Sequence, residues 1–328
     1  MKLAAGRQPR PPVLSVAPMM ERTDRPFRAL LRHVTRRTLL YTEMVHAAAI
    51  VRGSARHGLV VSPDEHPIAL QLGGDDPVQL AEAARIGVDL GYDEVNLNVG
   101  CPSERVQSGC FGAVLMKQPA RVAVAVSAMR NAVAVPVTVK HRLGVDHQDD
   151  AEFLFGFVDQ VAAAGCDRFT IHARKAWLSG LSPSENRTVP PLRPAEVWAL
   201  KAARPQLVVE LNGGVVDVSG AVAHLGRVDA VMIGRAFWDD PFRFHDVDSR
   251  LFGGTDCGFS RADIANCLVA WAAAHSPGHA HRVARVMLNL FAGQPGARRW
   301  RRILSEAALR VNASVGDLGR AVNLALDN

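Results

Sequence analysis

The sequence predicts an α/β protein in which a (β/α)8 TIM barrel is followed by a small C-terminal all-helical domain. Between Leu14 and Arg235 the chain holds eight short apolar segments, and stretches long enough for a helix separate most of them. Strand and helix in eightfold alternation are typical of a closed parallel barrel. After Phe244 the alternation stops and only helical stretches follow. A doubly wound open sheet is the competing arrangement for the alternating part.

The expected elements are read from apolar periodicity and from turn residues. The strands comprise residues 14–19, 39–44, 68–73, 94–100, 136–142, 168–174, 207–214 and 230–235. Helices are expected at 25–33, 77–90, 119–131, 151–164, 194–203 and 217–225, and in the last domain at 262–275, 281–291, 299–310 and 315–326. Asp75, Asp76 and Pro77 are typical of a capped helix start with proline in the first turn.

Composition divides the chain into four parts. Residues 1–12 are expected to be a flexible tail, and residues 13–245 form the barrel. The Gly-rich stretch 246–258 is interpreted as a linker, and residues 259–328 as the helical domain. The chain is 48% hydrophobic and 21% charged, which is enough apolar material for a full core.

Several classes of protein are disfavoured by composition. No run reaches the roughly 18 apolar residues of a membrane span, and the N-terminus lacks the apolar stretch of a signal peptide. We therefore expect a cytoplasmic protein without membrane contact. The five cysteines include no CxxC and the twelve histidines no HExxH, so we expect neither a disulfide framework nor a metal site. A net charge of +6 allows an anionic partner without naming one.

Most of the predicted strands end in polar residues. In a parallel barrel all carboxyl ends of the strands lie at one rim, so these residues are expected to surround a single mouth. In chain order they are Met19, Glu43, Gln71, Asn98 with Cys101, Lys140, His172, Asn212, and Gly234 with Arg235. One such residue is most often a satisfied hydrogen-bonding group, whereas eight at one rim indicate an active site.

Cys101 follows the strand 94–100 directly and stands between Gly100 and Pro102. A thiol on a turn made sharp by glycine and stiff by proline is presented rather than packed. The alternative is a half-buried structural cysteine, because free cysteine behaves as a small hydrophobe.

The loops after the seventh and eighth strands carry glycines and an arginine. They comprise Asn212, Gly213 and Gly214, and then Gly234 and Arg235. Barrels commonly hold a phosphate there, since backbone N–H groups can approach it and an arginine neutralises its charge. The glycines could instead serve only to make turns.

The absence of one sequence motif limits which phosphorylated ligands are expected. No GxGxxG occurs, which disfavours a tightly held Rossmann-type nicotinamide or FAD. A mononucleotide such as FMN fits better, with Lys140 placed to stabilise negative charge on a reduced ring and Gln71 to bond its carbonyl edge. Spacing alone does not distinguish a flavin from another phosphorylated ligand.

Two basic regions suggest a polyanionic partner. The loop between His172 and Pro194 contains Arg174, Lys175, Trp177 and Arg187, and loops of this length are usually functional or disordered. From Ile264 to Ser305 the chain has no Asp or Glu, and the segment QPGARRWRR places four arginines around Trp300. Arginine binds phosphate and an aromatic ring can stack on an exposed base. The alternative is a solvated helix face with Trp300 in the core.

Long motifs of the chain resemble the tRNA-dihydrouridine synthases, and within them the A-type bacterial branch that acts on the D-loop. The motifs are SVAPMM, LLYTEM, HPIALQLGG, YDEVNLNVGCPSERVQSGCFGAVLM, VPVTVKHRLG, IHARKAWLSGLSPSENR, LNGG, VMIGR and PGARRWRRILSE, and together they extend over nearly the whole chain. The resemblance implies an enzyme that uses FMN and NADPH, has tRNA as its partner, and binds that tRNA with its helical domain 259–328.

The resemblance also implies roles for individual residues. Cys101 would be the proton donor. FMN would be contacted by Pro18, Met19, Met20, Gln71, Lys140, His172, Asn212, Gly213, Gly214, Gly234 and Arg235. The tRNA would be contacted by Asn98, Ser184, Arg187, Arg298 and Arg301.

Three positions depart from the family pattern. Arg22 stands where relatives commonly have tryptophan, so the contact expected of that ring is changed. Ser184 replaces a familiar lysine, which removes one positive charge from the phosphate contacts. Val114 replaces a frequent cysteine, and we expect no catalytic loss from it because Cys101 is intact.

The mechanism implied by the resemblance is a two-part reduction of the C5–C6 bond of uridines 20 and 20a. Flavin N5 would give a hydride to C6 from one face of the base, and Cys101 a proton to C5 from the other. An ordinary thiol, with a pKa of about 8.5, is mostly protonated at neutral pH and can act as the acid. Asn98 would orient the uracil, while Lys140 and His172 would stabilise developing charge. The uridine must be extruded from the tRNA to reach the mouth.

Two other functions stay open on the sequence alone. The first is an FMN barrel that acts on a free pyrimidine or an enone, with the helical tail as an oligomerisation module. The second is a non-catalytic RNA-binding or RNA-chaperone protein on a barrel that has lost its activity. Activity on free uridine nucleotides would favour the first, and bound flavin without NADPH oxidation the second. We expect a monomer.

Overall fold

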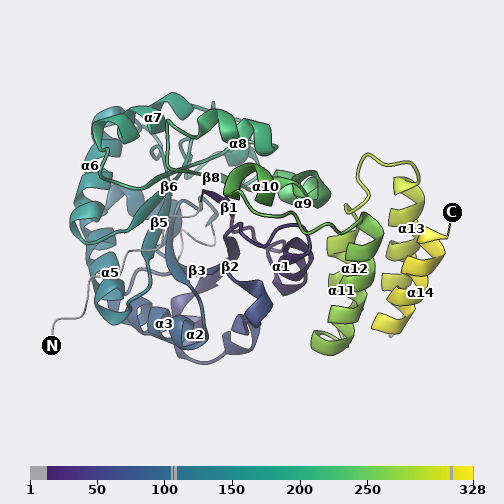
Figure 1. Ribbon diagram of the computed structural model, residues 1–328. Coiled ribbons are helices and arrows are strands. Elements are labelled where there is room, and N and C mark those ends of the chain that lie inside the picture. Colours follow the sequence, from purple (N-terminus) through teal and green to yellow (C-terminus); the bar gives the residue numbers. More distant parts are fainter. Residues whose placement is uncertain (1–12, 105, 107–108, 311–312, 328) are drawn as a thin grey trace.

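The computed structural model describes residues 13–104, 106, 109–310 and 313–327 (Figure 1). The predicted tail, residues 1–12, lies outside the described residues. A parallel sheet of eight strands forms the centre, and helices surround it (Figure 1). The strands are β1 Leu14–Val16, β2 Leu40–His46, β3 Ile68–Gly73, β4 Glu94–Val99, β5 Val137–Arg142, β6 Arg168–His172, β7 Val209–Asn212 and β8 Ala230–Ile233.

The sheet closes into a barrel. Its strand order is β1-β8-β7-β6-β5-β4-β3-β2, and every pair of neighbours is parallel. The first and last members of this order meet at the start of β2, where Val16 N donates to Leu39 O at 2.9 Å and Leu39 N donates to Leu14 O at 3.1 Å. The predicted TIM barrel is therefore confirmed, and the open-sheet alternative is wrong.

The helices around the barrel begin and end close to the predicted positions, except α2, which was not predicted. They are α1 Arg25–Arg32, α2 Ala47–Val51, α3 Pro77–Asp89, α5 Pro119–Ala132, α6 Ala151–Ala163, α7 Pro194–Ala203 and α8 Val218–His224. Aspartate side chains cap several of them. The carboxylate of Asp76 accepts from the N–H of Val78 at 2.9 Å, with Pro77 at the first helical position, as the sequence predicted.

The stretch expected as a linker is partly helical. After α9 Arg235–Asp239 the chain forms α10 Val247–Phe252, which occupies the first half of residues 246–258. Asp248 is buried and accepts hydrogen bonds from Thr35 Oγ1 at 2.6 Å and from Arg36 N at 2.7 Å. The glycines that suggested a flexible connector thus follow a short helix that is anchored to the barrel.

The C-terminal part is a bundle of helices beside the barrel, on the side of α1 (Figure 1). It comprises α11 Arg261–His275, α12 Ala280–Met287, α13 Ala297–Ala308 and α14 Val315–Leu326. Arg285 of α12 forms an ion pair with Asp24 at 2.6 Å and donates to the carbonyl of Glu21. Both partners belong to the loop between β1 and α1, so the bundle touches a loop at the barrel mouth.

Charged and polar side chains fill one layer inside the barrel. Glu94 Oε1 accepts from Tyr41 OH at 2.6 Å and from Arg168 Nη2 at 2.7 Å. Glu210 accepts from Ser15 Oγ at 2.6 Å and lies 3.5 Å from Arg168 Nε. Buried charges are tolerated when they are paired and hydrogen-bonded. This layer can therefore fill the barrel interior beneath the mouth.

Candidate active site

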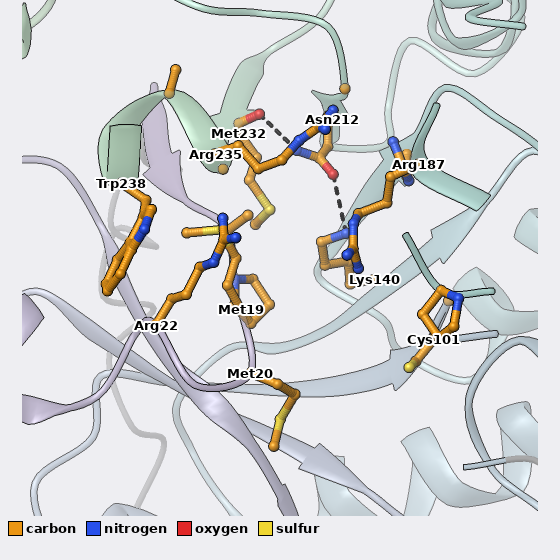
Figure 2. Close-up of a pocket in the computed structure, with 18 of the residues that line it drawn as sticks. Met19, Met20, Arg22, Cys101, Lys140, Arg187, Asn212, Met232, Arg235 and Trp238 are labelled. Atoms are coloured by element: carbon orange, nitrogen blue, oxygen red, sulfur yellow. Dashed lines mark hydrogen bonds between the residues drawn. The ribbon is translucent and has the colours of Figure 1, made fainter. Parts of the chain in front are cut away.

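A cavity of about 1090 Å³ opens at the carboxyl ends of the strands. It is lined by most of the predicted site residues, although they are distant in sequence, and the exceptions are Glu43, Ser184, Arg298 and Arg301. Those lining it are Pro18, Met19, Met20, Gln71, Asn98, Cys101, Lys140, His172, Arg187, Asn212, Gly213, Gly214, Gly234 and Arg235 (Figure 2). The predicted convergence on one mouth is present in the structure.

Cys101 lies on a tightly held turn after β4. The Oδ1 atom of Asn98 accepts from the backbone N–H groups of Gly100 and Cys101, both at 3.0 Å. The carbonyl of Cys101 accepts from Ala113 N at 2.9 Å. A Cβ on Gly112 would stand 2.5 Å from this carbonyl, and the φ of Gly112 is +76°, so glycine is needed there. The half-buried Cys101 thus lines the cavity from a fixed backbone.

A ladder of amides connects this turn to the barrel interior. Asn98 Nδ2 donates to Gln71 Oε1 at 3.0 Å, and Gln71 Nε2 donates to Asn96 Oδ1 at 2.8 Å. Asn96 in turn donates to Thr138 Oγ1 at 2.8 Å. Asn98 and Gln71 therefore have internal partners, and each keeps one amide hydrogen for a ligand.

Lys140 and Asn212 face each other in the cavity. Lys140 Nζ donates to Asn212 Oδ1 at 3.1 Å, and Asn212 Nδ2 donates to Met232 O at 2.8 Å (Figure 2). Burial, together with the nearby charge of Arg142, lowers the pKa of Lys140 to about 8. Lys140 therefore loses its positive charge at a pH only slightly above neutral.

His172 is neutral at physiological pH. Burial lowers its pKa well below the usual value, and the positive charges of Arg142 and Lys140 lower it further. A neutral imidazole can donate one hydrogen bond to a ligand, but it contributes no charge. The cation beside it is Lys140.

Two consecutive glycines follow β7 and form a narrow wall of the cavity. Gly213 has a φ of +107°, and a Cβ there would stand 2.6 Å from His172 Cδ2. Gly214 has a φ of +79°, and its Cβ would stand 2.5 Å from Leu192 Cδ1. Side chains are excluded at both positions, which leaves the backbone accessible to a ligand.

Three arginines bring positive charge to the cavity, and none of them is paired with an acidic side chain among the described residues. Arg22, Arg187 and Arg235 line it (Figure 2), and within residues 13–104, 106, 109–310 and 313–327 their guanidinium groups donate no hydrogen bond and form no ion pair. The guanidinium of Arg22 lies over the ring of Trp238, 5.5 Å from its centroid. Guanidinium groups in this state suit phosphate ligands.

The prediction for Glu43 is wrong. The register of β2 against β3 shifts between Tyr41 and Met44, so Met44 lines the cavity instead. The carboxylate of Glu43 accepts from the N–H of Glu21, and burial raises its pKa. Glu43 therefore supports the loop after β1. A bulge of this kind leaves no mark in the apolar alternation.

Arg142 is the main residue that the sequence analysis missed. It lines the cavity from the end of β5, two residues beyond Lys140. Side chains at alternate positions of a strand point to the same face, so the KHR motif contained the signal. Trp238 and Arg285 also line the cavity, and no pattern in the sequence placed them there.

Three predicted RNA contacts lie outside the cavity. Ser184 is exposed on the loop after β6, and its carbonyl accepts from Arg187 N at 3.0 Å. Arg298 and Arg301 are exposed on α13, away from the barrel (Figure 1).

The predicted stacking role of Trp300 is wrong. Its side chain is only 2% exposed, and its Nε1 donates to Met287 O at 2.8 Å. Arg299 beside it donates to the carbonyls of Leu324 and Ala325 and so joins α13 to α14. The aromatic residue of the QPGARRWRR segment belongs to the core of the helical bundle.

Two classes of site leave no trace in the described part of the chain. No cluster of three or more His, Cys, Asp or Glu side chains there is arranged to hold a metal ion. None of the helices described combines the length and the apolar character needed to cross a bilayer.

Comparison of the fold with solved structures gives two reductases at low sequence identity. Morphinone reductase superposes with a TM-score of 0.52 at 14% identity, over 74% of this chain and 86% of that one. 2-Naphthoyl-CoA reductase superposes with a TM-score of 0.55 at 13% identity, over 72% of this chain and 49% of that one. At these identities the likeness concerns the fold alone.

Sequence comparison is more specific. The tRNA-dihydrouridine(20/20a) synthase of Synechocystis sp. is 55% identical over 92% of this chain and 90% of its own length. The enzyme of the same name from Escherichia coli K12 is 48% identical over 95% of this chain and 91% of its own length. The family model of the dihydrouridine synthases matches residues 15–323. The chain therefore belongs to the dihydrouridine synthase family.

Proposed function

We propose that this enzyme reduces the C5–C6 bond of uridines 20 and 20a in the D-loop of tRNA to 5,6-dihydrouridine, with FMN as cofactor and NADPH as reductant. The observation that carries the proposal is the cavity itself, where a thiol on a fixed turn and a half-buried lysine line the same space as two glycines and unpaired arginines. The names of the relatives support the choice of substrate. A tRNA substrate implies a cytoplasmic enzyme.

The residues present fit FMN. A phosphate needs donors and positive charge, and Gly213, Gly214 and Arg235 offer open backbone and an unpaired guanidinium. Lys140 and the free amide hydrogen of Gln71 suit the polar edge of the ring, with Pro18, Met19, Met20, His172, Asn212 and Gly234 as the remaining contacts. When bound, FMN supplies the hydride that C6 of the uracil accepts.

The protein's own residues complete the reaction. Cys101 donates its proton to C5, from a position that Asn98 and Ala113 fix through the backbone. Asn98 keeps one amide hydrogen for the uracil. Lys140 and neutral His172 stabilise the charge that develops on the base or cofactor, in a site where burial strengthens such interactions.

The tRNA is held by exposed polar and basic groups at the cavity and beyond it. Arg187 and Ser184 lie at the loop after β6, and Arg298 and Arg301 on α13 of the helical bundle. In this proposal residues 259–328 are the tRNA-binding part, and the exposed arginines on α13 support it.

The direct test uses the purified protein. We expect it to be yellow, to release FMN on denaturation, to oxidise NADPH, and to form dihydrouridine at positions 20 and 20a of unmodified tRNA. Free uridine should not be reduced at a comparable rate. A colourless protein that gains no flavin absorbance on reconstitution would contradict the proposal, as would normal dihydrouridine at both positions in a strain that lacks the gene.

Replacing Arg298 and Arg301 together by alanine should weaken tRNA binding about tenfold at 100 mM salt. It should also reduce the slope of log affinity against log salt concentration by the equivalent of about two phosphate contacts. The reason is that each arginine released from a phosphate no longer displaces a counterion. Filter binding across a salt series measures both quantities. The matched control is Arg85→Ala with Arg121→Ala, two exposed arginines on α3 and α5, which should leave affinity and slope unchanged. An unaltered slope in the α13 variant would assign another role to the bundle.

The affinity of the apoprotein for FMN should fall about tenfold between pH 7 and pH 9 because Lys140, with its pKa lowered to about 8, loses its charge in this range. Below pH 8 the ammonium form attracts the anionic ligand, and above it the neutral amine does not. Lys140→Met should bind FMN more weakly at pH 7 and with little dependence on pH. Flavin fluorescence titrations measure this, with Lys201→Met, a lysine paired with Asp229, as the control. An equal pH dependence in Lys140→Met would mean that another group causes it.

A further inference from the structure

Arg142 connects three backbone carbonyls that belong to two different loops. Its side chain is almost fully buried, and Nε donates to Gly100 O at 2.9 Å. Nη1 donates to Lys175 O at 3.0 Å and to Asn186 O at 2.9 Å. Burial lowers the pKa of Arg142 to about 10, which leaves the guanidinium charged at neutral pH. Charged donors of this kind make the stronger hydrogen bonds in proteins.

Each of the two loops carries a residue of the proposed reaction. Gly100 directly precedes Cys101, whose thiol lines the cavity. Asn186 directly precedes Arg187, which lines the cavity from the other loop. We call residues 173–193, between β6 and α7, the β6 loop. The carbonyls that Arg142 holds are therefore one residue away from the proton donor and one residue away from an RNA contact.

The β6 loop is itself firmly organised around Asn186. The amide oxygen of this buried side chain accepts from Trp177 N at 2.8 Å. Its nitrogen donates to the carbonyls of Trp177 at 2.9 Å and Leu181 at 3.1 Å. Arg187 is thus the neighbour in the chain of a residue whose side chain organises the loop and whose carbonyl is held by Arg142.

We infer that Arg142 is a positioning residue that couples RNA binding at Arg187 to the placement of the Cys101 thiol. The inference rests on the proposed function, because it assigns RNA to the β6 loop and proton donation to Cys101. The planar fork of the guanidinium fixes the relative position of its carbonyl partners, which a lysine ammonium cannot do. Without Arg142, the carbonyls of Gly100, Lys175 and Asn186 lose this hydrogen-bond donor. The link that Arg142 makes between the turn of Cys101 and the β6 loop is then lost.

A direct contact between Arg142 and the uracil is the competing explanation, because Arg142 lines the cavity. The two explanations differ for Asn186, which is buried and does not line the cavity. Under the coupling proposal Asn186→Ala loosens the β6 loop and reproduces the loss seen on replacing Arg142. Under the contact explanation Asn186→Ala has no such effect.

The experiment measures single-turnover formation of dihydrouridine at saturating tRNA in the full-length FMN-loaded protein. We expect Arg142→Met and Arg142→Lys to lower the rate 30-fold or more, and Asn186→Ala about tenfold, with the tRNA dissociation constant changed less than threefold. NADPH oxidation by Asn186→Ala should stay within twofold. Arg187→Ala should lower the rate about tenfold alone but less than twofold in the Asn186→Ala or Arg142→Met background, since coupled residues are non-additive.

A second measurement reports the accessibility of the Cys101 thiol and does not depend on catalysis. In FMN-free protein, iodoacetamide alkylation of Cys101, located by mass spectrometry, should change at least fivefold in rate when Asn186 or Arg142 is replaced. Alkylation of Cys267 on α11 is the internal control and should stay constant. Additive rate losses, or an Asn186→Ala protein with unchanged alkylation and unchanged rate, would overturn the inference. Failure of the proposed function is distinguishable, because the unaltered protein would then form no dihydrouridine.

Discussion

Cys101→Ala is expected to lower the single-turnover rate of dihydrouridine formation by about 10²- to 10⁴-fold, which is the range that a positioned general acid contributes. The physical reason is that C5 of the uracil needs a proton from the face opposite the hydride. The thiol on the turn after β4 is held toward the cavity by two backbone hydrogen bonds to Asn98. Rapid-quench analysis of tRNA with pre-reduced enzyme measures the rate.

The same variant should keep its FMN and its rate of NADPH oxidation within about twofold, because the thiol is needed only for the uracil. Cys110→Ser is the matched control, since Cys110 lies beyond the same turn but is exposed and does not line the cavity. It should retain full activity. Dihydrouridine formed at an unchanged rate by Cys101→Ala would remove this residue from the mechanism.

The positions of the strands could be predicted because burial of both faces gives short continuous apolar runs. Residues 68–73 were predicted as a strand and form β3 with the same bounds. The convergence of Gln71, Lys140 and Asn212 on one mouth followed from barrel geometry alone, since the carboxyl ends of parallel strands share a rim. This much of the site is a consequence of topology.

The failures concern features that depend on side-chain partners. The register shift in β2 turned Glu43 toward Glu21, and an alternating pattern cannot reveal a bulge. Trp300 between arginines has the same sequence whether it stacks on a base or packs in a core, and here it packs. The Gly-rich stretch before α11 concealed α10, which is anchored through buried Asp248.

The contacts of Asn98 also differ from those expected of it. The sequence suggested a substrate contact, whereas in the structure its carbonyl oxygen shapes the Cys101 turn and one amide hydrogen binds Gln71. Under the proposed function, replacing Asn98 should therefore disturb the turn of Cys101 as well as uracil binding. Arg142 is the reverse case, since no role was assigned to it from the sequence, and the structure places it between two functional loops.

Gly213→Ala is expected to weaken FMN binding about 100-fold, which corresponds to ~2.7 kcal/mol. At a φ of +107° an alanine is strained, and its Cβ would stand 2.6 Å from His172 Cδ2 and 3.2 Å from Leu192 Cδ2. The imidazole must move away from the ligand, and the methyl group occupies the space in which a phosphate or ring could approach the backbone. Equilibrium titration of the apoprotein with FMN measures the loss.

Gly226→Ala separates backbone strain from the loss of the ligand site. Gly226 has a similar φ of +93°, but a Cβ there meets nothing within 4 Å. It lies in the loop before β8, and so at the end of the barrel opposite the mouth. Both substitutions should lower the midpoint of thermal unfolding of the apoprotein, because both place a side chain at positive φ, and Gly213→Ala should lower it more because of its clash with His172. Only Gly213→Ala should lose FMN affinity. If the two variants bound FMN equally well, the glycines after β7 would be turn residues, and the phosphate would have to lie elsewhere in the cavity.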